Sequence, residues 1–185
     1  MKKFLLFIVV LIGIVFLLNE EYKVKHYSDS YDKTTSVDSK DQVIFVRGLG
    51  KYSQSDLDIA SKEITKMFGV KCEIIEPMKT DGSLYTVNGK LNVLSCRNSF
   101  NGFHKTVYVT SEYIISHERV VCGASFGNFA IVSNNFNDLR NTTLHEFAHT
   151  LGLDHCDNQC LLGHLELGDD KGDFCNNCKL KLNLK

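Results

Sequence analysis

The segment HEFAHTLGLDH, residues 145–155, constrains the fold of this chain more than any other feature. His145 and His149 are four residues apart, so on a helix both imidazoles lie on one face, one turn apart, where they can share a metal ion. Glu146 lies beside them and can take a proton from a water molecule at that metal. The spacing therefore predicts a helix that carries a metal site.

A third histidine reaches the same metal only if the helix ends. His155 comes six residues after His149, which on a continuous helix would place it about 9 Å further along the axis and roughly 240° around it. Gly152 stands where the chain must turn back, and glycine adopts positive φ without strain. The pattern predicts three neutral histidine ligands and an open fourth position, as in a catalytic zinc site.

Four of the seven cysteines lie in the last thirty residues. Cys156 directly follows the third histidine, Cys160 comes four residues later, and Cys175 and Cys178 form a C-x-x-C pair. Two close pairs separated by a loop are typical of a structural zinc with four cysteine ligands, which would fold a tail poor in apolar residues. Disulfides between the two pairs are the alternative, because export would permit them. In a further alternative, His164 replaces one of the cysteines as a ligand.

Residues outside these two clusters give no sign of further chemistry. The other cysteines lie in apolar segments and are predicted to be buried thiols: Cys72, Cys96 and Cys122. The isolated histidines are predicted to be exposed or hydrogen-bonded: His26, His104 and His117. A net charge of −1 gives no electrostatic reason to expect nucleic acid as a partner.

The N-terminal segment predicts export. Lys2 and Lys3 precede a predominantly apolar run, residues 4–18, and acidic residues follow it, a charge order that favours an N-terminus inside and the remainder outside. As a helix the run would extend only about 22 Å, short of a bilayer core of about 30 Å, and no small-residue cleavage site follows. We expect a signal anchor, with a cleaved signal peptide or a buried core helix as alternatives. Residues 19–41 are polar and predict a spacer.

The rest of the chain, residues 42–185, shows a mixed helix and strand pattern. β-branched runs at residues 43–46 and 70–75 flank a helical repeat of apolar residues at 57–68, which predicts parallel strands joined by a crossover helix. Ser53 or Ser55 can cap that helix, and Gly69 can end it. Thr143, three residues before Glu146, suggests a capping box. The other elements are expected at 91–96 (helical turns), 107–109, 120–122 and 130–132 (strands), and 139–151 (the helix of the histidine motif).

The motifs resemble those of the archaemetzincins, zinc metallopeptidases of the metzincin type. HEFAHTLGLDHC, a second cysteine and the terminal FCNNC follow that family's order, and CGASFGNFAIVSNNF resembles the segment before its active-site helix. Two features depart from the family: three rather than four residues separate the first two cysteines, and Leu162 replaces a methionine that forms an apolar floor beneath the metal. Leucine has a similar volume, so the site should survive at a cost under about 1.5 kcal/mol.

The resemblance implies a metzincin-like α/β (α+β) fold, with a mixed twisted sheet, an active-site helix and a small zinc-bound subdomain at residues 156–178. It implies two zinc ions per chain. The catalytic zinc would bind three histidines: His145, His149 and His155. The structural zinc would bind four cysteines: Cys156, Cys160, Cys175 and Cys178.

The expected activity is hydrolysis of peptide bonds, with Glu146 as the general base and a peptide adding to a strand edge within residues 127–133. We expect a monomer whose catalytic domain lies outside the cytoplasm, attached to the membrane through residues 4–18 or secreted. A catalytically silent zinc- or peptide-binding module is the alternative. A two-zinc scaffold protein that acts through its anchor and spacer is a third reading.

Overall fold

The computed structural model describes residues 42–100, 102, 104–136, 138–163 and 172–184, together with the two-residue strand β1 (Tyr27–Ser28). The predicted anchor at residues 4–18, most of the spacer, His26 and His164 lie outside the described residues. Within the part of the chain that the structure describes, no helix has the length and apolar character that crossing a membrane requires.

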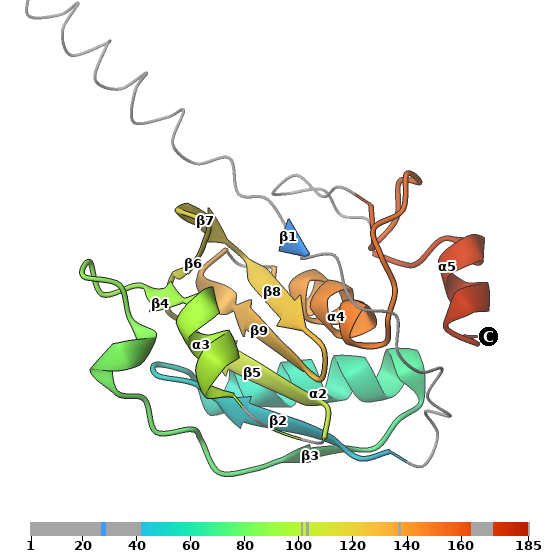
Figure 1. Cartoon of the computed structure of the whole chain (residues 1–185). Helices are drawn as coiled ribbons and strands as arrows, with labels where there is room; N and C mark the ends of the chain where they lie inside the picture. The colour runs from blue at the N-terminus through green and yellow to red at the C-terminus, as the bar shows by residue number, and fades with distance from the viewer. Residues whose placement is uncertain are drawn as a thin grey trace, which may run out of the picture.

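A six-stranded mixed sheet forms the centre of the domain, in the order β1-β8-β9-β5-β2-β3 (Figure 1). Its strands after β1 are β2 (Ile44–Gly48), β3 (Cys72–Ile74), β5 (Thr106–Thr110), β8 (Gly123–Phe126) and β9 (Phe129–Ser133). Strands β3, β2, β5 and β9 are parallel, β8 runs antiparallel to β9, and β1 runs parallel to β8. The predicted parallel pair is confirmed, since β2 and β3 are direct neighbours.

The helix between β2 and β3, α2 (Gln54–Phe68), begins and ends as its sequence predicts. Ser53 accepts a hydrogen bond from the Asp56 backbone N–H at 3.2 Å, which satisfies one of the free donors at the helix start. Gly69 adopts φ 65° and donates its N–H to the Thr65 carbonyl, so the helix ends there. Its apolar residues are buried: Leu57, Ala60 and Ile64.

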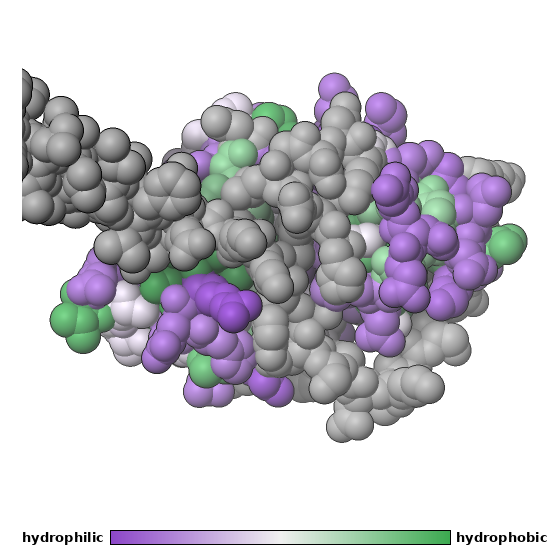
Figure 2. Space-filling model, turned by 90° about the horizontal axis from the view of Figure 1, so that it is seen from above, coloured by the Kyte–Doolittle hydropathy of each residue, from purple (hydrophilic) through white to green (hydrophobic). Residues whose placement is uncertain are grey.

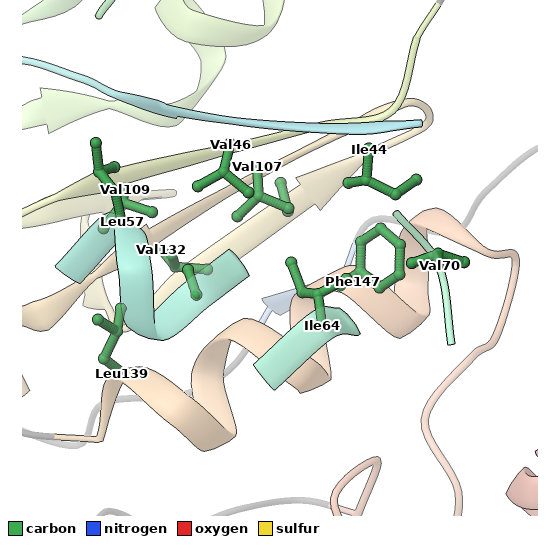
Figure 3. Packing of buried hydrophobic residues seen from close by; sticks show 12 residues of the cluster. Ile44, Val46, Leu57, Ile64, Val70, Val107, Val109, Val132, Leu139 and Phe147 are labelled. Carbon is green, nitrogen blue, oxygen red and sulfur yellow. The ribbon is translucent and has the colours of Figure 1, made fainter. Parts of the chain in front are cut away.

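A second helix, α4 (Leu139–Thr150), lies beside α2 on the same face of the sheet (Figure 1). Between the helices and the sheet lies the main core, where side chains from β2, β5 and β9 meet those of α2 and α4 (Figure 3). Phe147 is fully buried there, and its ring packs edge-on against Phe68 of α2 with 4.9 Å between centroids. This core fixes α4 against the sheet.

Smaller elements cover the opposite face of the sheet. They surround a second apolar core that includes Leu91, Tyr108 and Phe126. Asn92 caps the helix on this face by accepting hydrogen bonds from two backbone N–H groups. The elements are β4 (Leu91–Asn92), β6 (Ile114–Ser116) and β7 (Arg119–Val121), which form a three-stranded sheet, with α3 (Val93–Ser99) and the 3₁₀ turn η2 (Gly82–Leu84). A second 3₁₀ turn, η3 (Asn134–Phe136), connects β9 to α4, and Asn134 donates a hydrogen bond to Asp56 of α2 at 2.8 Å.

Three sequence-based predictions are wrong. Thr143 does not form a capping box, because α4 begins four residues earlier and Thr143 is buried inside it. Residues 127–133 offer no free strand edge, because β9 is paired on one side with β8 and on the other with β5. Cys72 is only partly buried, whereas Cys96 and Cys122 are buried as predicted.

The described surface is mostly hydrophilic in the view of Figure 2. Large apolar side chains that are exposed come from different elements: Tyr52, Ile59, Ile74, Val87, Leu94, Tyr113 and Leu180. The expectation of a monomer stays a prediction.

Replacing Phe147 with alanine should lower the free energy of unfolding by about 3–5 kcal/mol, because a fully buried ring leaves a cavity between α4 and α2. Denaturant unfolding followed by circular dichroism measures this. Ile59→Ala is the matched control, since Ile59 lies on α2 with 42% of its surface exposed and should change stability by under about 0.5 kcal/mol. Equal losses in the two variants would contradict this assignment of the core.

Candidate metal centre

Helix α4 is buried along nearly its whole length, and it carries two of the histidines and Glu146. Phe147 faces the main core, while Leu144 and Ala148 face a third apolar cluster formed with the C-terminal segment. His145 and Glu146 are fully buried, and His149 is 8% exposed. A helix covered on several sides shows no clear amphipathic pattern, and the polar motif residues are enclosed by protein.

The end of α4 is a glycine turn that reverses the chain. Gly152 adopts φ 85°, which a side chain would disfavour, and its N–H donates to the His149 carbonyl at 2.9 Å. The Leu153 N–H donates to the Ala148 carbonyl at 3.3 Å, which completes a Schellman motif. The turn directs His155 back to the helix, so the predicted glycine break is confirmed.

A buried lysine fixes the same helix end to the sheet. Lys105 immediately precedes β5, and its Nζ donates a hydrogen bond to the backbone carbonyl of Thr150, which is the last residue of α4. Burial lowers the pKa of Lys105. A cation at this position complements the negative end of the helix dipole.

The three histidines converge. Nε2 of His145 lies 3.0 Å from Nε2 of His149 and 3.1 Å from Nε2 of His155. One ring nitrogen from each can serve the same ion, since these atoms all lie within 4.8 Å of one another. The structure thus brings together the three residues that the spacing singled out.

Two backbone carbonyls set the tautomers of the helix histidines. Nδ1 of His145 lies 2.5 Å from the Leu161 carbonyl oxygen, and Nδ1 of His149 lies 2.5 Å from that of Leu153. A carbonyl can only accept, so each Nδ1 carries the proton and each Nε2 presents a lone pair. Lone pairs facing one another at 3.0 Å repel unless a cation lies between them. The donor set therefore fits a metal ion, and neutral imidazole is a ligand that zinc prefers.

Strand β8 approaches Glu146 so closely that only glycine fits. A Cβ atom at Gly123 would lie 2.6 Å from Cγ of Glu146 and 3.0 Å from the Ile131 carbonyl oxygen. Next to it, burial and the nearby negative charge of Glu146 raise the pKa of the Cys122 thiol to about 12, so this thiol is neutral. Gly123 thus sets the distance between the first residue of β8 and the glutamate.

The four C-terminal cysteines form a second cluster. Their sulfur atoms lie within 4.8 Å of one another, with Cys156 Sγ 3.1 Å from Cys160 Sγ. All seven cysteines lie in the described part of the chain and each is a free thiol, so the disulfide alternative is not found. The Cys178 backbone N–H donates to Cys175 and lowers the pKa of that thiol to about 6. Four converging thiols fit a tetrahedral metal site.

Apolar contacts also attach the tail to α4. Phe174 is buried against the cluster that includes Leu144 and Ala148, and Leu182 and Leu184 of the tail pack at its margin. The short helix α5 (Asn176–Lys181) carries Cys178 into this cluster, where Leu162 is also fully buried.

No protein-family model matches the chain, and no curated protein matches it in sequence. Among solved structures it is similar to the archaemetzincin from Archaeoglobus fulgidus complexed with malonate, with a TM-score of 0.67 and 19% identity over 76% of this chain and 99% of that one. The archaemetzincin from Methanopyrus kandleri has a TM-score of 0.65 and 19% identity, over 79% of this chain and 95% of that one. A zinc-dependent peptidase from Methanocorpusculum labreanum has a TM-score of 0.62 and 17% identity, over 76% of this chain and 100% of that one. The chain therefore has the archaemetzincin fold, as its motifs predict.

Gly123→Ala should lower the free energy of unfolding by about 1–3 kcal/mol, because β8 or Glu146 must move to admit the methyl group. Chemical denaturation of the metal-loaded protein measures the loss. Gly82→Ala is the control, since a Cβ there meets no heavy atom within 4 Å. Unchanged stability in Gly123→Ala would show that β8 and α4 are not in tight contact.

Proposed function

We propose that this chain is a zinc-dependent peptidase whose catalytic centre consists of His145, His149, His155 and Glu146. The observation that carries the proposal is the convergence of three histidine nitrogens, two of them fixed as lone-pair donors, beside a fully buried glutamate on the same helix. A purely structural zinc site would use all four positions for protein ligands, whereas three histidines leave one open for a water molecule. The archaemetzincin fold supports the same class of activity.

The proposed mechanism assigns a distinct task to each residue. The three histidines hold the ion, and zinc, when bound, supplies Lewis-acid chemistry that lowers the pKa of a water molecule and polarises a carbonyl oxygen. Glu146 takes a proton from the attacking water and delivers it to the leaving amine, so the C–N bond breaks as a C–O bond is gained. The chain has no tyrosine after Tyr113, so no tyrosine on the segment after α4 assists.

The cysteine cluster is proposed to hold a second, structural zinc. Cys156 and Cys160 follow α4, whereas Cys175 and Cys178 lie at the start of α5 and within it, so one ion would join residues that are distant in sequence. We propose a peptide or protein as the substrate. Export, attachment through residues 4–18 and the monomeric state remain predictions from the sequence.

Glu146→Gln should reduce peptide hydrolysis by about 10²–10⁴-fold while leaving metal bound, because glutamine keeps the shape of the side chain but cannot accept the proton. Turnover of a diverse peptide mixture by the purified protein, followed by mass spectrometry, measures the loss. Metal content per chain is determined on the same samples. His145→Ala is the comparison, since it should lose metal and activity together.

The silent-module alternative has a distinct outcome in this experiment. A wild-type protein that holds zinc yet cleaves no peptide, with or without chelator, would support a binding module. Cleavage that a chelator abolishes and zinc restores supports the peptidase. Activity retained in Glu146→Gln would exclude the glutamate as the base.

A further inference from the structure

The histidine and cysteine clusters are joined at two points. The first is covalent, because His155 belongs to one cluster and Cys156, the next residue, to the other. Any ion that holds the Cys156 sulfur therefore restricts where the His155 ring can lie. No residue separates His155 from Cys156, so a movement of the Cys156 backbone also moves the backbone of His155.

The second connection is the hydrogen bond between His145 Nδ1 and the Leu161 carbonyl oxygen, at 2.5 Å. Leu161 directly follows Cys160 and is fully buried, as is His145. This carbonyl decides which nitrogen of His145 carries the proton, and so whether Nε2 can donate a lone pair to an ion. A ligand of one cluster is thus oriented by a backbone group of the other.

The position of that carbonyl depends on the cysteine segment. The Leu161 N–H donates to the carbonyl of Asp173 at 3.0 Å, and Asp173 lies two residues before Cys175. The Cys156 N–H donates to the Leu162 carbonyl at 3.0 Å, and the Gly163 N–H to the Cys160 carbonyl at 2.7 Å. These hydrogen bonds join the peptide units on either side of the Leu161 carbonyl to Cys156, to Cys160 and to the backbone just before Cys175.

We propose that metal binding at the four cysteines raises the affinity of the three histidines for their own metal, with Leu161 as the positioning residue. The proposal takes from the proposed function only that the histidines bind a metal, and does not require that the protein cleave peptides. With the cysteines empty, only backbone hydrogen bonds and apolar contacts hold the segment that carries the Leu161 carbonyl, so the Nδ1-protonated tautomer of His145 is fixed less firmly. Loss of such an outer partner typically weakens metal binding by about 10–100-fold.

The coupling must be reciprocal. If the filled cysteine site strengthens metal binding at the histidine site by some factor, then the filled histidine site strengthens metal binding at the cysteine site by the same factor. Two substitutions that each damage the fold independently need not give equal factors. Equality of the two factors therefore separates coupling from simple instability of the tail.

The first measurement uses the full chain with Cys178→Ser, which breaks the cysteine site from the residue most distant in sequence from His145. Zinc affinity of the histidine site is measured by competition with a chromophoric chelator, and cobalt absorption distinguishes thiolate from imidazole ligation. We expect about 10–100-fold weaker binding at the histidines. Cys96→Ser is the matched control, because Cys96 is equally buried but lies in the core on the other face, and its histidine site should be unchanged.

The second measurement is the reverse experiment on His149→Ala, whose four cysteines are intact. Zinc affinity of the cysteine site should fall by the same factor that Cys178→Ser imposes on the histidine site. Nitrogen NMR of the His145 ring gives a third measure: its Nδ1-protonated tautomer should be fixed in the wild type and less firmly fixed in Cys178→Ser. If Cys178→Ser fails to fold, His149→Ala still tests the coupling from the side of the histidine site.

Two results would overturn the proposal. One is a histidine site in Cys178→Ser that binds zinc within about twofold of the wild type while the cysteine site is empty. The other is a pair of factors that differ by tenfold or more. Loss of peptidase activity in every preparation would remove the proposed function but leave these affinities, and hence the coupling, measurable.

Discussion

The convergence of three imidazole rings is the constraint on which the local structure depends, with Nε2 of His145 lying 3.0 Å from that of His149 and 3.1 Å from that of His155. The Nε2 lone pairs of His145 and His149 repel one another, so the scaffold must hold the rings against that repulsion. It does so with backbone groups: a glycine turn returns His155, and two carbonyls orient His145 and His149. The rest of the domain serves to keep those backbone groups in place.

The burial of α4 explains how a small domain can sustain such a site. One side of the helix contributes Phe147 to the main core beneath the sheet, and another contributes Leu144 and Ala148 to the cluster shared with the tail. Lys105 joins the helix end to β5, and Gly123 allows β8 to lie against Glu146. Displacement of the helix would therefore disturb several contacts at once, which makes its position well defined.

Much of this arrangement could be predicted from the sequence, because the predictable parts are local. Helix α2 follows from apolar spacing, a serine cap and Gly69, and the metal motif follows from its spacing and Gly152. Strand β8 could not be predicted, since its glycine and serine composition suits a loop. The carbonyls of Leu153 and Leu161 that orient the histidines could not be predicted either, because every residue carries a backbone carbonyl and its side chain does not show what that carbonyl binds. The role of Gly123 had one weak signal, a glycine beside an apolar run.

Gly152 and Gly123 need glycine for opposite reasons. At Gly152 the space around a Cβ atom is open and only the positive φ excludes ordinary residues. Because the requirement there is a left-handed backbone conformation and not a small side chain, a D-amino acid introduced by chemical synthesis would fit the turn. At Gly123 the limit is volume, and a methyl group placed there would meet Glu146. The histidine that closes the site therefore depends on the chirality of one position, and the glutamate on the size of another.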